Sequence, residues 1–211
     1  MVVSGTEVNT RPFSRPAEAL EVVPGLIVTQ HSGDGKANQY FLRGFNLDHG
    51  TDFAITVDRM PVNMRTHGHG QGYADLNFLI PELIGSIDIR KGPYFADEGD
   101  FSSVGAAHIN LINGMPGSMA SLTMGSFGYW RGLGITSNKV GDGTLLAAGE
   151  VNAYNGPWDN PDDLRKLNGV VRYSHGTPDD GFSLTAMAYS NRWNSTDQIP
   201  LRAIESGEIG R

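Results

Sequence analysis

Histidine is the side chain of this sequence that offers the most chemistry. Only six histidines occur in 211 residues, and four of them fall between residues 31 and 69. The polar residues of that stretch that could share one ligand are His31, Asp34, Asp48, His49, Arg65, His67 and His69. Imidazole is a ligand of zinc, copper, iron and nickel, and a guanidinium favours an anionic chelate. The stretch predicts contact with a metal ion or chelate, and chance enrichment at solvated loop tips is the competing interpretation.

The pair His67 and His69 is the most specific metal-binding pattern here, because His-x-His on an extended segment can hold one ion. A hydrolytic zinc site needs three protein ligands and a base. His49 and Asp75 are the nearby candidates, and the sequence contains no HExxH motif. We therefore expect that the protein is not an enzyme, and a metal-dependent enzyme that uses His67 and His69 is an alternative.

Composition excludes several other classes. The net charge of −7, without a cluster of Lys and Arg, argues against nucleic acid as a partner. The 28 glycines are about 13% of the chain against roughly 7% in typical proteins, and no Gly-X-Y period accompanies them. There is no Cys, so disulfides and thiolate zinc sites are excluded. No secretory signal is visible in residues 1–20, and no run of 18 apolar residues predicts a membrane-spanning helix.

The first half of the chain predicts a small α+β unit that positions these loops. Residues 15–23 predict a short helix with Pro16 in its first turn, and residues 81–84 a helical turn. The segments that predict short strands are residues 26–28, 39–43, 53–58, 86–90 and 106–112. Long Gly-rich loops separate these elements, and loops of that length are usually functional.

After residue 115 the pattern changes to longer strands in which apolar and polar residues alternate. The predicted strands are residues 119–124, 129–138, 144–155, 167–174 and 182–191. Tight links at residues 139–143 and 175–181 alternate with a longer one at residues 155–166. Such strands are typical of an outer-membrane β-barrel, but a soluble antiparallel sandwich alternates in the same way. Periodicity leaves both open.

Five motifs in order favour the barrel over the sandwich. They are Val22-Val23-Pro24-Gly25-Leu26, Phe41-Leu42-Arg43-Gly44-Phe45, Val57-Asp58-Arg59-Met60-Pro61-Val62, Ile87-Asp88-Ile89-Arg90-Lys91-Gly92-Pro93 and Gly105-Ala106-Ala107-His108-Ile109-Asn110-Leu111. Their succession resembles the plug domain of TonB-dependent outer-membrane receptors. The resemblance implies a plug, a small mixed sheet with short helices, at residues 15–115. It further implies that residues 116–211 are about the first five antiparallel strands of an incomplete transmembrane β-barrel, and that residues 1–14 are a remnant of the TonB-contact region. Because the family's barrel has 22 strands, we expect an N-terminal fragment.

The resemblance also implies structural and gating roles for plug residues. These residues are Gly25, Arg43, Gly44, Asp58, Arg90 and Gly92. A positive φ or close packing is expected at the three glycines. Arg43 and Arg90 are expected to be buried and to need carboxylate partners, either on the barrel wall or from Asp58, Glu82 or Asp88 of the plug. The sequence departs from the family at Arg59, where Gly is usual, and in its longer and more acidic segment at residues 94–103.

The function that the resemblance implies is energy-coupled uptake of a metal chelate, siderophore-like, or of another scarce nutrient. Three loops, at residues 30–36, 46–52 and 63–73, are expected to contact that ligand, so the polar residues named at the outset are its predicted binding site. The expected partners are TonB with its inner-membrane energising complex, outer-membrane lipid and the ligand itself. We expect no resident cofactor, a monomeric full-length receptor, and the outer membrane of a Gram-negative bacterium. The alternative is a secreted, soluble, β-rich binding module.

Overall fold

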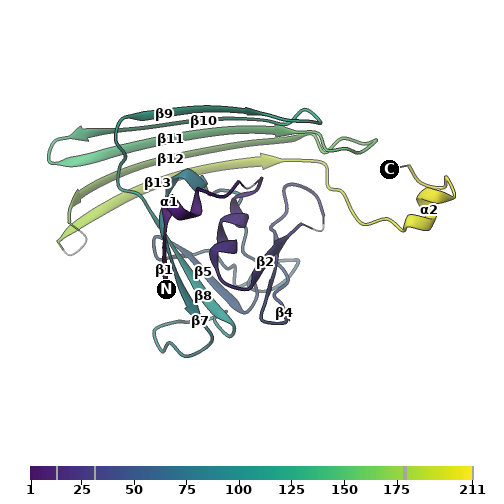
Figure 1. Ribbon diagram of the computed structural model, residues 1–211, viewed down its shortest axis with the longest axis horizontal. Helices are drawn as coiled ribbons and strands as arrows, with labels where there is room; N and C mark the ends of the chain where they lie inside the picture. Colours follow the sequence, from purple (N-terminus) through teal and green to yellow (C-terminus); the bar gives the residue numbers. More distant parts are fainter. Residues whose placement is uncertain (13, 31, 178–179, 211) are drawn as a thin grey trace. The chain divides into compact units, whose positions relative to one another are not determined.

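The computed structural model describes residues 1–12, 14–30, 32–177 and 180–210 of the chain (Figure 1). The chain forms two compact units. The first comprises residues 1–30 and 36–112, and the second comprises residues 32–35 and 113–210. Each unit has its own sheets and is described separately.

The first unit is built on a mixed five-stranded sheet with the order β1-β7-β8-β5-β6. Its strands are β1 (Val2–Ser4), β5 (Phe53–Val57), β6 (Met60–Pro61), β7 (Ile84–Lys91) and β8 (Gly105–Leu111). β5 and β8 are parallel, and the other neighbours are antiparallel. Val2–Ser4, in the N-terminal segment, pairs with Ser86, Ile87 and Asp88 of β7.

Short elements complete this unit. They are the helix α1 (Gly5–Val8), the 3-10 helices η1 (Pro16–Val22) and η2 (Pro81–Leu83), and the three-stranded sheet of β2 (Leu26–Thr29), β3 (Gln39–Leu42) and β4 (Phe45–Asn46). The predicted helix at residues 15–23 is thus a 3-10 helix. The Glu18 carboxylate caps its start by accepting hydrogen bonds from the backbone N (2.7 Å) and Oγ (3.1 Å) of Ser14.

The core of the first unit consists of apolar side chains from its strands, its 3-10 helices and the segments beside them. The largest fully buried ones include Leu20, Tyr40, Phe53, Ile55, Ile80, Leu83, Ile87, Ile89 and Ile109. Ile55, Ile87 and Ile109 come from three adjacent strands, β5, β7 and β8, so the core lies against the centre of the mixed sheet. These strands support the loops that leave their ends.

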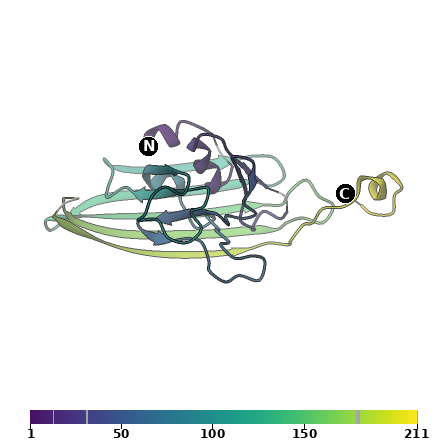
Figure 2. The same ribbon diagram turned by 90° about the horizontal axis from the view of Figure 1, so that it is seen from below.

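The second unit contains one antiparallel sheet with the order β13-β12-β11-β10-β9. Its strands are β9 (Ser118–Met124), β10 (Trp130–Val140), β11 (Gly143–Tyr154), β12 (Leu164–Gly176) and β13 (Gly181–Arg192). They run side by side over most of their length (Figure 2). A short helix, α2 (Leu201–Glu205), follows them and was not predicted. The predicted fold class, a mixed-sheet plug followed by antiparallel strands of an unclosed barrel, is confirmed.

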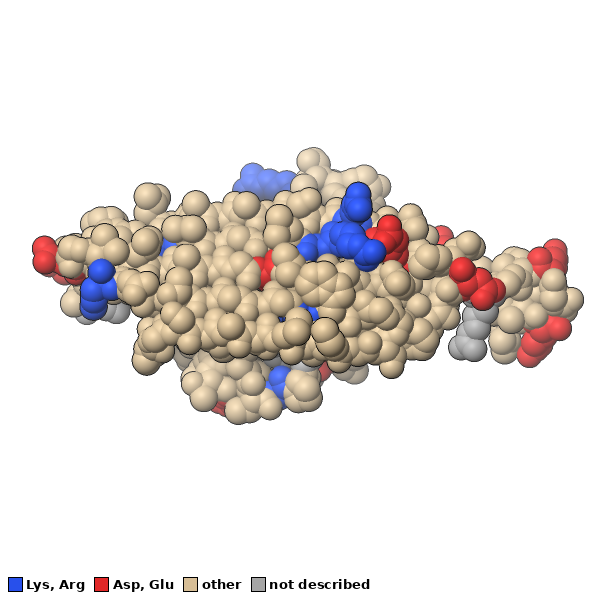
Figure 3. All heavy atoms as spheres, turned by 90° about the horizontal axis from the view of Figure 1, so that it is seen from above, with Lys and Arg blue, Asp and Glu red and all other residues tan. Residues whose placement is uncertain are grey.

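The two faces of this sheet differ in polarity. One face exposes apolar side chains, among them Leu122, Leu145, Val151, Leu167, Val171 and Leu184. Residues at the alternate positions include the buried polar side chains Glu150, Asn152, Asn168, Arg172 and Ser174. The space-filling view from above shows few charged side chains (Figure 3). The other face also buries apolar side chains such as Ile135, Leu146 and Val170, so both faces contribute apolar residues, as is typical of the strands of an outer-membrane barrel.

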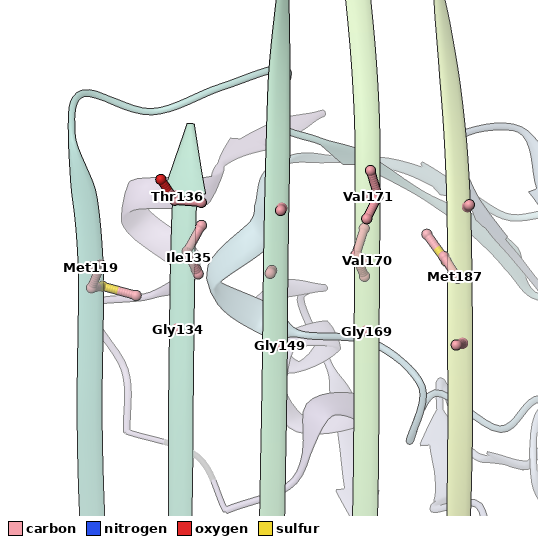
Figure 4. Close-up of a pocket in the computed structure, with 13 residues that line it drawn as sticks. Met119, Gly134, Ile135, Thr136, Gly149, Gly169, Val170, Val171 and Met187 are labelled. Carbon is pink, nitrogen blue, oxygen red and sulfur yellow. The ribbon is translucent and has the colours of Figure 1, made fainter. Parts of the chain in front are cut away.

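A row of small and apolar side chains crosses the middle of the sheet in register. Met119, Ile135, Ala148, Val170 and Met187 are paired successively from β9 to β13. Together with neighbours such as Gly134, Gly149 and Gly169 they line a shallow hollow of about 590 Å³ (Figure 4). Thr136 is the one lining residue with a polar side chain, so the hollow lacks the several converging polar groups of a specific ligand site.

The helices of the described residues do not include one that is long and apolar enough to cross a membrane.

The hairpin between β5 and β6 contains the departure at Arg59. Its two central residues, Asp58 and Arg59, have φ values of 47° and 67°. Such a two-residue turn needs positive φ at both positions, which explains why Gly would fit the second. Asp58 also ties the turn to β8, because its Oδ1 accepts a hydrogen bond from the backbone N of Leu111 at 3.0 Å.

We expect Arg59→Gly to raise the free energy of unfolding by about 1 kcal/mol, because it removes the Cβ that a left-handed residue must accommodate. Urea denaturation of the chain in detergent measures the change. Arg59→Ala is the matched control, since it removes the exposed guanidinium but keeps the Cβ, and it should give no comparable gain. An equal gain in both variants would show that charge, rather than φ, limits this turn.

Candidate functional site

The side chain of Asn63 joins the two loops that carry most of the predicted ligand residues, at residues 46–52 and 63–73. It is 9% exposed. Its Oδ1 accepts a hydrogen bond from the backbone N of Ile55 at 2.7 Å. Its Nδ2 lies 3.0, 2.9 and 3.0 Å from the carbonyl oxygens of Gly50, Phe53 and Gly72. One buried amide thus holds the end of the first loop, the start of β5 and the end of the second loop.

Backbone contacts bring the same loops together. The backbone N of Ala74 donates to the carbonyl of His49 at 2.7 Å, and Thr51 Oγ1 donates to the carbonyl of Gln71 at 2.7 Å. Gly50 has a φ of 118°, and a Cβ there would lie 2.7 Å from that of Ala74. A glycine is therefore required where the loops approach each other.

His49 is the buried histidine of this site, with 2% of its surface exposed. Its Nδ1 lies 2.8 Å from the carbonyl oxygen of Ala37 and 3.2 Å from that of Asn38. Because carbonyl oxygens only accept hydrogen bonds, Nδ1 carries the proton and Nε2 carries the lone pair. Burial lowers the pKa of this imidazole, and the contacts with Ala37, Asp48 and Asn38 oppose that effect. His49 is therefore neutral near pH 7.

Asp48 and His69 complete a cluster of possible metal ligands with His49. The Asp48 Oδ1 lies 3.9 Å from His49 Nε2, and its Oδ2 lies 3.8 Å from His69 Nε2. The ligand atoms of all three residues are within 4.8 Å of one another. The two imidazole rings meet edge to face with centroids 4.6 Å apart. Asp48 has a left-handed backbone, with φ of 44°, and its N donates to Asn46 Oδ1 at 3.0 Å.

His67 lies beside this cluster but is not one of its three members. Its ring stacks on that of Tyr73, with centroids 3.9 Å apart and an angle of 12°. Its Nδ1 accepts a hydrogen bond from the backbone N of His69 at 3.2 Å. The Tyr73 hydroxyl accepts one from the backbone N of Ala37 at 2.9 Å, and burial raises the pKa of Tyr73. Of the predicted pair, His69 is a member of the cluster, whereas His67 packs against the ring of Tyr73.

The remaining predicted ligand residues lie elsewhere. Arg65 is 85% exposed, and its Nη2 is 3.7 Å from Asp100 Oδ2. Asp34 is half-buried and belongs to the second unit. His31 lies outside the described residues.

Arg90, predicted to have a gating role, binds the acidic segment that departs from the family. Its Nη1 donates to both carboxylate oxygens of Asp97, at 2.8 and 2.7 Å, and its Nε is 3.2 Å from Glu98 Oε1. The hydrogen bond from Arg90 lowers the pKa of Asp97. Asp88, an expected partner, is farther away at 3.8 Å. Glu98 also lies 2.7 Å from His108 Nε2, so β7 and β8 both hold this segment.

The other predicted plug residues are mostly on the surface. Gly25, Gly44 and Gly92 adopt φ values of 84°, 82° and 78°. Arg43 is exposed, which corrects the expectation of a buried guanidinium at this position. It follows a short strand that ends at Leu42, and its own left-handed φ of 54° turns the chain there.

In the second unit, Glu150 is the centre of a polar network that was not predicted. It is 1% exposed and lies on β11 between β10 and β12. It accepts hydrogen bonds from Arg131 Nε at 2.6 Å and Asn168 Nδ2 at 3.1 Å, and Lys166 Nζ lies 2.7 Å away. The buried Glu150 carboxylate is thus paired with cationic and amide groups of the two neighbouring strands, as a buried charge requires.

Comparison with known proteins identifies the class. The TonB-dependent Receptor Plug Domain family matches residues 1–106, just over half of the chain. The chain therefore belongs to the TonB-dependent receptor plug family, as its motifs predicted. The family is one of receptors, so the expectation that the protein is not an enzyme is also confirmed.

Solved structures show the same fold. The copper transporter OprC is 22% identical with a TM-score of 0.69, covering 92% of this chain and 31% of its own. The FrpB iron transporter from Neisseria meningitidis (F3-3 variant) is 17% identical with a TM-score of 0.67, covering 90% and 31%. The ferric enterobactin receptor PfeA from Pseudomonas aeruginosa, as its Q482A mutant, is 15% identical with a TM-score of 0.61, covering 90% and 33%. The chain spans about a third of the length of these proteins.

We expect Asn63→Ala to lower the free energy of unfolding by about 2–4 kcal/mol, because it leaves a buried backbone N–H and carbonyls without their partner. Urea denaturation followed by circular dichroism measures the loss. Asn9→Ala is the matched control, because Asn9 is exposed although its Nδ2 also bonds two carbonyl oxygens. Equal losses in the two variants would contradict the central role of Asn63.

Proposed function

We propose that the chain forms the plug and the first barrel strands of a TonB-dependent outer-membrane receptor that takes up a metal ion or metal chelate. The observation that carries the proposal is the family match combined with the imidazole-rich loops of the plug unit. The printed names of the structural neighbours, a copper transporter, an iron transporter and a ferric enterobactin receptor, agree with a metal-bearing cargo. The cargo itself passes through unchanged.

The sheet of the second unit supports a location in the outer membrane of a Gram-negative bacterium. Its exposed apolar face suits contact with lipid, and its compensated Glu150 lies at the alternate, polar positions. The proposed partners are outer-membrane lipid, TonB with its inner-membrane energising complex, and the ligand. The full-length receptor is proposed to be monomeric.

The ligand-binding role belongs in this proposal to the plug loops. Asp48, His49 and His69 supply metal ligands, and His67 supports His69. His31, Asp34 and Arg65 are retained as proposed contacts of the cargo. Gating is assigned to the glycine turns at Gly25, Gly44 and Gly92 together with Arg43, Asp58 and Arg90. Ligand outside and TonB inside would each favour one of two plug states.

Uptake measured in cells tests this function. The receptor that carries this chain is expressed in a Gram-negative strain with TonB and in one without it, and radioactive Cu²⁺, Zn²⁺ and ferric enterobactin are supplied. We expect uptake of at least one probe to depend on TonB. We also expect His67→Ala combined with His69→Ala to reduce that uptake about tenfold or more, because one proposed ligand of the cargo and the residue that positions it are removed.

Assembly is checked in the same strains by the amount of receptor in the outer-membrane fraction. His175→Ala, which removes an exposed histidine of β12, is the matched control and should transport normally. Equal uptake of every probe with and without TonB would contradict the proposed function. Unchanged uptake by the double variant would remove His67 and His69 from the binding site.

A further inference from the structure

The geometry around Asp48 is that of an open metal site. Its two carboxylate oxygens each face the Nε2 atom of a different histidine, at 3.9 Å for His49 and 3.8 Å for His69. Imidazole and carboxylate ligands bond a zinc or similar ion at about 2.0–2.2 Å, which places neighbouring ligand atoms roughly 3.3 Å apart in a tetrahedral site. To close the site, each histidine has to approach Asp48 by about half an ångström, and the ligand atoms of all three residues, which lie within 4.8 Å of one another, have to draw together around the ion. Asp48 and His69 have half-exposed side chains on loops, so they can make that movement.

A second observation points to a metal ion independently of the distances. Histidines that bind metals usually donate their other ring N–H to a carbonyl or carboxylate, which fixes the tautomer and orients the ring. His49 has this arrangement, because its Nδ1 contacts the carbonyl oxygens of Ala37 and Asn38. The buried ring therefore presents the Nε2 lone pair toward Asp48.

The backbone of Ala37 supports the cluster through both its N–H and its carbonyl group. The Ala37 carbonyl holds His49, and the Ala37 N–H donates to the Tyr73 hydroxyl at 2.9 Å. Tyr73 in turn stacks on His67, whose Nδ1 accepts from the backbone of His69. His67 and Tyr73 are thus positioning residues for the two histidines of the cluster.

We propose that Asp48, His49 and His69 bind one borderline divalent transition-metal ion, directly and without an organic chelator. As an account of the cargo, this rests on the transport function proposed above. Two imidazoles and one carboxylate suit Cu²⁺ and Zn²⁺, and Cu²⁺ binds such ligands more tightly. A ferric ion saturated by a chelator offers no coordination position to an imidazole. Three protein ligands leave one position for water.

Titration of the purified 211-residue chain in detergent with Cu²⁺ tests the site. Isothermal titration calorimetry gives the affinity, and electron paramagnetic resonance counts the nitrogens bound to Cu²⁺. We expect one tight ion per chain with two coupled nitrogens. His69→Ala should weaken binding at least tenfold and remove one nitrogen. Asp48→Asn should weaken binding about tenfold and keep both nitrogens, because it changes only the oxygen ligand.

Two further variants separate ligands from neighbours. His67→Ala should keep both coupled nitrogens, because His67 positions His69 without binding the ion. His175→Ala should match the parent chain in affinity and spectrum. Circular dichroism checks that each variant is folded. If Asp48→Asn fails to fold because of the left-handed backbone at Asp48, His69→Ala alone still tests the site. Unchanged affinity and nitrogen count in His69→Ala, or loss of a nitrogen in His67→Ala, would overturn the proposed site.

These outcomes are distinct from failure of the transport function. Binding is measured without TonB, so a two-nitrogen Cu²⁺ site with no TonB-dependent uptake would support the site and overturn transport alone. The opposite combination is also informative. If uptake of ferric enterobactin depends on TonB but the Cu²⁺ spectrum is unchanged in His69→Ala, the proposed site is overturned and the transport function is not.

Discussion

The buried side chain of Asn63 is the interaction on which the candidate site depends. The loops at residues 46–52 and 63–73 contain no regular ladder that could satisfy their backbone groups. Asn63 contacts the N–H of Ile55 and three carbonyl oxygens at the ends of these loops. A buried peptide group without a partner is costly, so these contacts determine how the loops leave β5. Asp48, His49 and His69 meet because that amide, together with the hydrogen bonds from Ala74 to His49 and from Thr51 to Gln71, brings both loops to one place.

Chemistry at the site follows from a second backbone constraint. The carbonyl of Ala37 decides which nitrogen of His49 carries the proton, and the N–H of the same residue anchors Tyr73. Burial keeps the imidazole neutral by lowering its pKa. A neutral ring with its lone pair beside a carboxylate is suited to a cation, whereas a protonated ring would form an ion pair with Asp48 and exclude one. The backbone of the plug thus fixes both the tautomer and the orientation of His49.

Elsewhere in the chain, charge is placed where it can be compensated. Arg90 holds the acidic segment at residues 94–103 through the two oxygens of Asp97, and His108 adds a contact through Glu98. In the second unit, Glu150 is surrounded by Arg131, Lys166 and Asn168, while the exposed positions of the same strands are largely apolar. Alternation along each strand thus separates an exposed apolar face from a face that combines compensated polar side chains with buried apolar ones.

The sequence by itself determined the family, the mixed-sheet plug and the five antiparallel strands, because ordered motifs and two-residue alternation are local properties of the chain. It also directed attention to the loops that carry the histidines. Only the tertiary structure decided which of these side chains lie together. His67 and His69 are neighbours in sequence, but His67 stacks on Tyr73, and His69 meets His49 from the other loop. The same is true of Arg90, which binds Asp97 of a loop at 2.7 Å and has the expected Asp88 only at 3.8 Å. Loop conformation depends on long-range contacts such as those of Asn63, and no local pattern encodes these contacts.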